Sequence, residues 1–298
     1  MESPLKAWAL LAVALGAFVP FAATQVPSVS AGFVIDHDTR PDAGLQAKLE
    51  LVDGALREKL GVPADVVAVG LVDLRTARVA WLRPDAGDYA ASVPKIGILL
   101  AWFATHPAAT KSVDPEVRRE LGEMIKRSNN EAATRFSREL GISRVQAVLD
   151  AHGFYDAKRG GGIWFGKHYG RDSERVRDPV GGNTHAATVR QLMRFYLLLE
   201  QDRLVSPEAS AAMRDIFRSP GIPHIGDRFV KGLAGREREI RRKSGWWEQW
   251  SHDTAVVTGG GRHYILVALT RHPQGTAYLE GLAPALDDAL GSDPGAAR

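Results

Sequence analysis

Strand-like segments lie near both ends of the chain, and helical segments fill the region between them. The first strands are predicted at 66–73 and 77–82, and the last at 239–244, 254–258 and 264–270. Strands so far apart in sequence bury their apolar faces most simply in one shared sheet. We therefore predict an α/β (α+β) fold, in which an antiparallel sheet of about five strands is built from both ends of the chain.

Two terminal helices and an inserted helical subdomain complete this expected architecture. Apolar residues at helical spacing predict a helix over 44–60 and another over 277–290, which would flank the sheet. The sheet part is then expected at 32–91 and 210–298, and the helical part at 92–209. Helices within the helical part are predicted at 96–104, 115–125, 131–140, 143–152 and 184–200, and a further helix is predicted to start at Ser206-Pro207-Glu208. Asp114 would cap the helix that starts at Pro115. The apolar face of the helix over 184–200 is formed by Leu192, Phe195, Tyr196 and Leu199.

The composition excludes several classes of protein. None of the 298 residues is cysteine, which removes disulfide scaffolds, cysteine-ligated zinc and cysteine nucleophiles. The 38 basic and 35 acidic residues leave a net charge of +3, too small to indicate a nucleic-acid surface. The histidines show no metal-binding spacing. We therefore expect neither a metal nor a cofactor.

The N-terminus has the pattern of a secretory signal peptide. Lys6 precedes an apolar run over 7–23, which gives way to the small residues Val29-Ser30-Ala31. We expect cleavage after 31, a secreted or periplasmic protein, and no membrane attachment after cleavage. An uncleaved membrane anchor is the alternative, although a run of 17 residues is short for a bilayer.

A serine and a lysine stand where the first strands end and an apolar helix begins. In Ser92-Val93-Pro94-Lys95, the lysine follows the serine by one helical turn, so both side chains share a face. A serine hydroxyl needs a nearby base to act as a nucleophile, and a lysine serves when burial lowers its pKa. The alternative is that Ser92 is an ordinary helix N-cap.

Two further short elements follow in the same order along the chain. Ser128-Asn129-Asn130 lies between two predicted helices, where capping is the alternative explanation. Lys243-Ser244-Gly245 lies on a predicted strand, and a glycine there often marks a close approach of backbone or ligand. Its alternative is the end of a solvated basic stretch. The three elements together, on a helix start, a turn and a strand, are hard to assign to chance.

With these elements the chain resembles the class A-type serine β-lactamases and the penicillin-binding-protein superfamily, whose elements are Ser-x-x-Lys, Ser-Asp-Asn and Lys-Thr-Gly. The resemblance implies that Ser92 attacks the lactam carbonyl and that Lys95 activates it. It also implies that Ser128 relays a proton to the leaving nitrogen with help from Lys243. Asn130 would bind the acylamide side chain of the substrate.

The resemblance implies further binding groups on the third element. Ser244, with Lys243 nearby, would receive the substrate carboxylate. The backbone N–H groups of Ser92 and Trp246 would form the oxyanion hole. Gly245, between Ser244 and Trp246 on the strand, would also contribute to substrate binding. Apart from the resemblance, the position of Trp246, Trp247 and Trp250 beside this element suggests that they line a substrate cleft, with packing in the core or at the rim as the alternative.

Three departures from the family pattern stand out. Asn129 replaces the usual aspartate of the second element, and Ser128 follows Ser92 by 36 residues, which implies a trimmed helical subdomain. Class A enzymes also carry a loop glutamate that activates the deacylating water. The segment 160–183 contains one glutamate, Glu174, so this residue is the candidate, with a solvated surface position as the alternative.

The expected function is that of an exported, monomeric serine hydrolase that opens β-lactam rings through an acyl-enzyme on Ser92. Its partner would be a small β-lactam or a peptidoglycan-like acyl donor, not a nucleic acid. The alternatives are a D-alanyl-D-alanine peptidase or esterase and a penicillin-binding protein that deacylates slowly.

Overall fold

The computed structural model describes residues 29, 32–170 and 174–291. Except for Val29, the predicted signal peptide therefore lies outside the described residues. The strands within the described ranges are β1 (Val67–Asp73), β2 (Arg78–Leu82), β3 (Asp88–Tyr89), β4 (Tyr155–Asp156), β5 (Gly161–Gly162), β6 (Trp164–Phe165), β7 (His185–Ala187), β8 (Glu239–Trp247), β9 (Trp250–Gly259) and β10 (Arg262–Arg271).

The helices follow the predicted order, with a short additional helix, α8, before the last strands. In the described part of the chain they are α1 (Ala43–Leu60), α2 (Lys95–Thr105), α3 (Pro115–Lys126), α4 (Asn130–Leu140), α5 (Ile142–Ala151), α6 (Val189–Glu200), α7 (Pro207–Arg218), α8 (Arg228–Gly232) and α9 (Gly275–Gly291).

The main sheet joins the two ends of the chain, as predicted. Its strands are antiparallel and run in the order β2-β1-β10-β9-β8. The first and last strands of the chain meet where β1 pairs with β10, from Val67 opposite Thr270 to Asp73 opposite Tyr264. Strand β8 lies at one edge of this sheet. The α/β (α+β) class and the five-stranded sheet are therefore confirmed.

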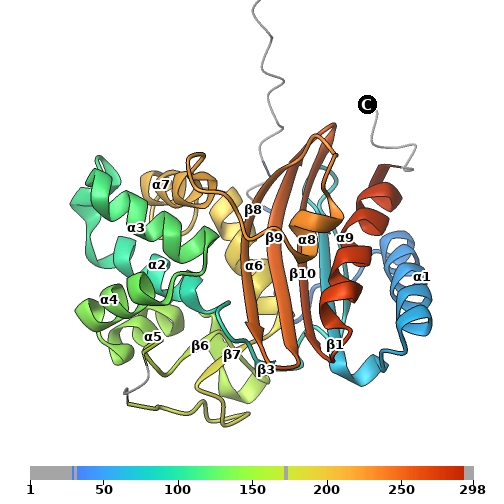
Figure 1. The fold of residues 1–298 in the computed structure, drawn as a ribbon, viewed down its shortest axis with the longest axis horizontal. Coiled ribbons are helices and arrows are strands. Elements are labelled where there is room, and N and C mark those ends of the chain that lie inside the picture. Colours follow the sequence, from blue (N-terminus) through green and yellow to red (C-terminus); the bar gives the residue numbers. More distant parts are fainter. Residues whose placement is uncertain (1–28, 30–31, 171–173, 292–298) are drawn as a thin grey trace, which may run out of the picture.

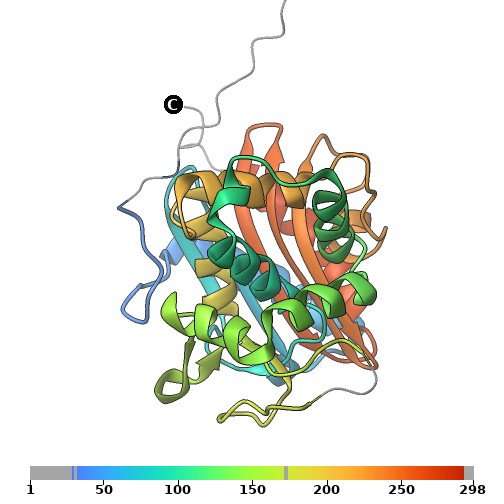
Figure 2. The same ribbon diagram turned by 90° about the vertical axis from the view of Figure 1, so that its left-hand side faces the viewer.

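An apolar layer covers each face of the sheet, because successive strand residues point to opposite sides. On β10, Ile265, Val267 and Leu269 are buried on the side of the helical subdomain. The residues between them, such as Leu266, pack on the other side with α1 and α9. Figures 1 and 2 show these two terminal helices on one face of the sheet and the helical subdomain on the other.

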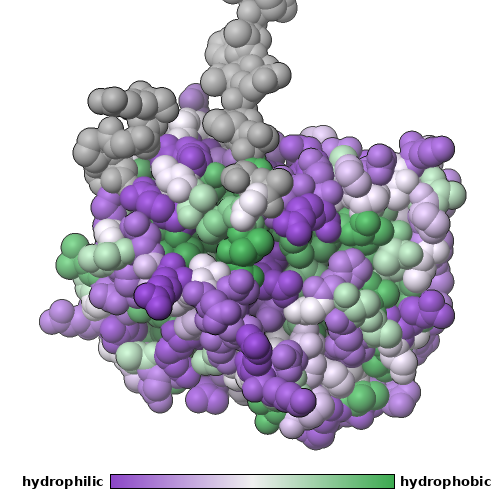
Figure 3. All heavy atoms as spheres, turned by 180° about the vertical axis from the view of Figure 1, so that it is seen from behind, coloured by the Kyte–Doolittle hydropathy of each residue, from purple (hydrophilic) through white to green (hydrophobic). Residues whose placement is uncertain are grey.

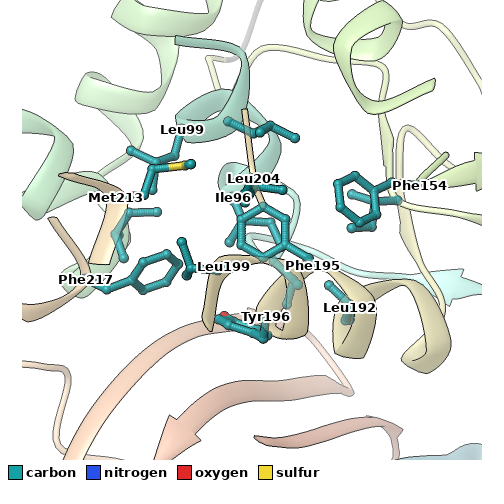
Figure 4. Packing of buried hydrophobic residues seen from close by; sticks show 14 of the residues in the cluster. Ile96, Leu99, Phe154, Leu192, Phe195, Tyr196, Leu199, Leu204, Met213 and Phe217 are labelled. Carbon is teal, nitrogen blue, oxygen red and sulfur yellow. The ribbon is translucent and has the colours of Figure 1, made fainter. Parts of the chain in front are cut away.

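Helix α6 is the central element between the sheet and the other helices. The predicted apolar stripe Leu192, Phe195, Tyr196 and Leu199 is fully buried. Tyr196 packs against Phe217 of α7 with a ring-centroid distance of 5.8 Å. Figure 4 shows these side chains gathered around α6 beneath α2 and α7. A buried helix at this place gives the helical subdomain a rigid base.

The predicted helix over 184–200 is wrong at its start. Residues His185–Ala187 form strand β7, which pairs with β3 and β6. The helix begins at Val189. Its N-cap is Thr188, whose side chain accepts a hydrogen bond from the N–H of Gln191. The pairing partners of β7 lie far away in sequence, so tertiary contacts override the local helical pattern.

Polar residues cover most of the face opposite to that of Figure 1, around a central group of apolar ones (Figure 3). Within the described residues, no helix combines the length and the apolar character that crossing a membrane requires.

Candidate active site

Ser92 lies in a tight turn that connects β3 to α2. The N–H of Lys95 donates to the carbonyl of Ser92 at 3.3 Å, and α2 begins only at Lys95. Ser92 is thus not the helix N-cap that was the alternative explanation, and no side chain caps α2. Its half-buried hydroxyl makes no hydrogen bond with the described residues and lines a cavity of about 210 Å³. The capping explanation for this serine therefore fails.

Lys95 is a fully buried amine beside this turn. Its Nζ donates to the carbonyl oxygen of Ser128 at 2.6 Å, to Asn130 Oδ1 at 2.7 Å and to Ser128 Oγ at 3.2 Å. Burial lowers the pKa of Lys95 from 10.5 to about 7. Near neutral pH a large fraction of this amine is therefore unprotonated and able to accept a proton.

The three residues of the second element make different contacts. Asn129 is the N-cap of α4, and its Oδ1 accepts from the N–H of Ala132 at 2.9 Å. Ser128 adopts a left-handed backbone conformation with φ of +55° and, with Asn130, contacts Lys95. An asparagine caps a helix as well as an aspartate does, so the departure at Asn129 is accounted for by local structure.

Lys243 reaches the same serine from the edge strand β8. Its Nζ donates to Ser128 Oγ at 2.9 Å and to the carbonyl of Ser244 at 2.6 Å. Burial, and next the charge of Lys95, hold the pKa of Lys243 well below its usual value. Two buried amines thus converge on the hydroxyl of Ser128, so a proton can pass between them through it.

Strand β8 passes directly against the Ser92 turn at Gly245. A Cβ at this position would lie 2.7 Å from the carbonyl oxygen of Ala90 and 3.2 Å from the backbone nitrogen of Ser92. Only glycine permits this approach, which brings the backbone of Gly245 beside the backbone nitrogen of Ser92. Ser244 is buried at the same stretch of strand.

The tryptophans after this element divide into two groups. Trp246 and Trp247 are 60% and 53% exposed and line the Ser92 cavity. Trp250 instead packs edge-on against Tyr89 at 5.5 Å and donates from Nε1 to Asp88 Oδ1. The first two therefore form an apolar rim, and the third supports strand β3.

Glu174 is not brought into the site. It is exposed, and among the described residues that line the Ser92 cavity there is neither aspartate nor glutamate. Its charge acts on His168 and raises the pKa of that imidazole, which burial lowers overall. The solvated position, which was the alternative for Glu174, agrees with this placement.

Sequence reasoning missed Tyr169 and His185. The Tyr169 ring centroid lies 4.3 Å from Lys95 Nζ, and the ring stacks on His185 at 4.6 Å. Tyr169 belongs to a segment without clear periodicity, where a single aromatic residue carries no signal of its own. His185 fell within the predicted helix over 184–200, which concealed its place on a strand. The cavity is lined by Tyr89, Ala91, Ser92, Asn130, Lys167, His168, Tyr169, Thr184, His185, Trp246 and Trp247.

A larger cavity of about 590 Å³ lies elsewhere, between the segment around Ile35 and helix α6. It contains none of the candidate residues of the three elements. A larger volume does not by itself identify a reaction site, and this cavity lacks the proposed nucleophile and its neighbouring groups.

Comparisons with known proteins identify the family and the fold. The family model of the Beta-lactamase enzyme family (Beta-lactamase2) matches residues 107–287, which include the second and third elements but not Ser92. A search of curated proteins found no match.

Solved structures share the fold at low sequence identity. A β-lactamase from Sphaerobacter thermophilus is 15% identical with a TM-score of 0.65, over 83% of this chain and 98% of its own. A class A β-lactamase from Mycobacterium abscessus is 16% identical with a TM-score of 0.63, over 83% and 100%. PBP-A is 16% identical with a TM-score of 0.64, over 85% and 99%. Since the family model covers more than half of the sequence, the chain belongs to the Beta-lactamase enzyme family.

Proposed function

We propose that this β-lactamase-like serine hydrolase opens β-lactam rings through an acyl-enzyme on Ser92. The observation that carries the proposal is the convergence of Lys95 Nζ and Lys243 Nζ on Ser128 Oγ, at 3.2 and 2.9 Å, beside the unbonded hydroxyl of Ser92. A nucleophile, a neutral base and a proton relay are the groups that acyl transfer requires.

The proposed acylation begins with Lys95. Its neutral amine takes the proton of the Ser92 hydroxyl as Oγ attacks the lactam carbonyl carbon. Ser92 bonds to no described residue, so rotation of its side chain toward Lys95 breaks no hydrogen bond. Catalytic hydrogen bonds often form only when substrate is bound.

Ring opening then needs a proton on the departing nitrogen. Ser128 would donate its hydroxyl proton there as the carbon–nitrogen bond breaks, and a protonated amine at Lys95 or Lys243 would replace it. The backbone N–H groups of Ser92 and Trp246 would bind the oxyanion, an arrangement that the close approach at Gly245 supports. A water molecule then hydrolyses the ester and returns Ser92 to its free state.

Substrate binding in this proposal uses residues of the second and third elements and the rim of the cavity. Ser244 and Lys243 would bind the carboxylate next to the lactam ring, and Asn130 the acylamide side chain. Trp246 and Trp247 add an exposed apolar rim that favours donors with apolar side chains.

Intact-protein mass spectrometry after mixing with benzylpenicillin tests this function. We expect an adduct with the mass of the whole penicillin that appears first and then disappears, while free penicilloate accumulates. An adduct that never disappears would make the protein a penicillin-binding protein instead. No adduct at all would contradict the proposed acylation.

Replacing Lys243 by alanine is expected to lower kcat/KM for a β-lactam at least about tenfold, or about 1.4 kcal/mol in transition-state free energy. The variant removes one donor to Ser128 Oγ and a cation near the expected carboxylate site. Steady-state hydrolysis of a chromogenic cephalosporin measures the loss. Lys48→Ala is the control, because Lys48 Nζ donates to the carbonyl of Ala289 on the other side of the sheet. An unchanged kcat/KM for Lys243→Ala would mean that Lys243 has a structural role and no part in the reaction.

Replacing Glu174 by glutamine is expected to leave both acylation and release at the parent rates. The side chain is exposed and does not line the Ser92 cavity. Glutamine keeps its size but cannot accept a proton, so it tests the general-base role alone. Time-resolved mass spectrometry measures both steps. Accumulation of the adduct only in the variant would restore Glu174 as the residue that activates water.

A further inference from the structure

Tyr169 contacts both the nucleophile turn and the base. It lies between β6 and β7, is half-buried, and has its hydroxyl enclosed by protein. The hydroxyl donates to the carbonyl oxygen of Ala91 at 3.1 Å. One ring face lies 4.3 Å from Lys95 Nζ, and the ring stacks on His185 with an interplanar angle of 15°.

The contact with Ala91 fixes the peptide unit that carries the N–H of Ser92. In a trans peptide the carbonyl and the following N–H point in opposite directions, so an anchor on one aims the other. Ala91 has a φ of +49°, a left-handed conformation that is unfavourable for a residue with a Cβ. Such a conformation persists only where neighbouring groups hold it, and the Tyr169 hydroxyl is one such group.

The contact with Lys95 acts on the base. An aromatic ring face favours a cation over a neutral amine, and it also keeps the amine chain in place. Among the described residues, Lys95 also faces the backbone carbonyl and the hydroxyl of Ser128 and the amide oxygen of Asn130, all uncharged, and the charge of its amine acts on Lys243.

His185 supports the ring from behind without adding charge. Its Nε2 lies 2.9 Å from the carbonyl oxygen of Lys167, and burial lowers its pKa to about 3. The imidazole is therefore neutral near pH 7, and stacking holds the Tyr169 ring against Lys95.

We propose that Tyr169 is a positioning residue for acylation: its hydroxyl aims the Ser92 N–H at the developing oxyanion, and its ring holds Lys95. The inference rests on the proposed acyl-enzyme at Ser92 and assigns a residue outside the three sequence elements. An oxyanion donor that points away loses most of its effect on the rate.

Two variants separate the two contacts. Tyr169→Phe keeps the ring and removes the bond to Ala91, so we expect acylation by benzylpenicillin to slow about tenfold at an unchanged pH dependence. Tyr169→Leu also removes the ring. The amine chain of Lys95 then loses its support, so we expect a larger loss of rate. The ammonium form also loses its favourable partner, so the acid limb should move about half a pH unit lower.

Stopped-flow acylation rates between pH 5 and 9 measure both effects, with circular dichroism as the test of folding. The matched control is Tyr155→Phe, which removes a hydroxyl bond to Asp178 Oδ1 outside the Ser92 cavity and should leave the rate unchanged. If Tyr169→Leu does not fold, Tyr169→Phe still decides whether the hydroxyl positions the Ser92 N–H, and an unchanged rate there overturns the proposal.

The outcomes distinguish the inference from the function on which it rests. A parent protein that forms no adduct overturns the proposed function, and the inference falls with it. A parent that is acylated while Tyr169→Phe is acylated equally fast overturns the positioning role alone. A folded Tyr169→Leu variant with an unmoved acid limb removes the role of the ring.

Discussion

Replacing Ser92 by alanine is expected to abolish the adduct with benzylpenicillin and to lower hydrolysis more than about 10³-fold. The hydroxyl of Ser92 bonds to no described residue and faces a cavity, so its removal opens no void in the core. The fold should therefore remain intact. Mass spectrometry with peptide mapping measures the adduct, and thermal unfolding followed by circular dichroism measures the fold.

Ser143→Ala provides the matched control, because Ser143 is an exposed serine near the start of α5. The Ser143→Ala variant should be acylated on Ser92 at the parent rate. Acylation of the Ser92→Ala protein at the parent rate, with the adduct mapped to another residue, would remove Ser92 as the nucleophile. Ser128 is the residue to inspect in that event, since two lysines already contact its hydroxyl.

The sequence predicted the fold best where a residue's role is local. Asp114 before Pro115 predicts the start of α3, and the structure confirms it through the bond from Glu116 N–H to Asp114 Oδ1. The apolar stripe from Leu192 to Leu199 likewise identified the core face of α6. These signals lie within one helical turn or along one face of a helix, where sequence spacing and spatial distance agree.

The assembly of the site depends on contacts that no local pattern encodes. Lys243 follows Ser128 by 115 positions, and only the placement of β8 at the sheet edge brings them within 2.9 Å. Their proximity could be inferred only from the family resemblance. Tyr169 was missed altogether, because its role arises from a backbone contact to Ala91, 78 positions earlier.

Geometry also separates the residues that cap a helix from those that do not. Both explanations require a serine or asparagine near a helix start, so residue type alone cannot separate them. In the structure Asn129 caps α4, whereas no side chain caps α2 and Ser128 faces two amines. One element thus combines a structural residue with the proposed proton relay.

The pH dependence of acylation should follow the protonation of Lys95. Burial lowers its pKa from 10.5 to about 7, and only the unprotonated amine can take the proton of Ser92. The rate should therefore rise with pH through about 7 and level off above it. A lysine with an ordinary pKa would still give a rising rate at pH 9.

Replacing Lys95 by methionine is expected to slow acylation about 10³-fold, the contribution typical of a positioned general base. Methionine fills most of the buried space but accepts no proton. Loss of the bonds to Ser128 and Asn130 also frees those side chains, so thermal unfolding must be measured beside the rate. Lys48→Met is the control, because Lys48 also donates to a backbone carbonyl but lies on α1, on the far face of the sheet. If the folded Lys95→Met protein acylates within tenfold of the parent and keeps the same acid limb, another group is the base. Lys243 is then the amine to test, because its Nζ already donates to Ser128 Oγ.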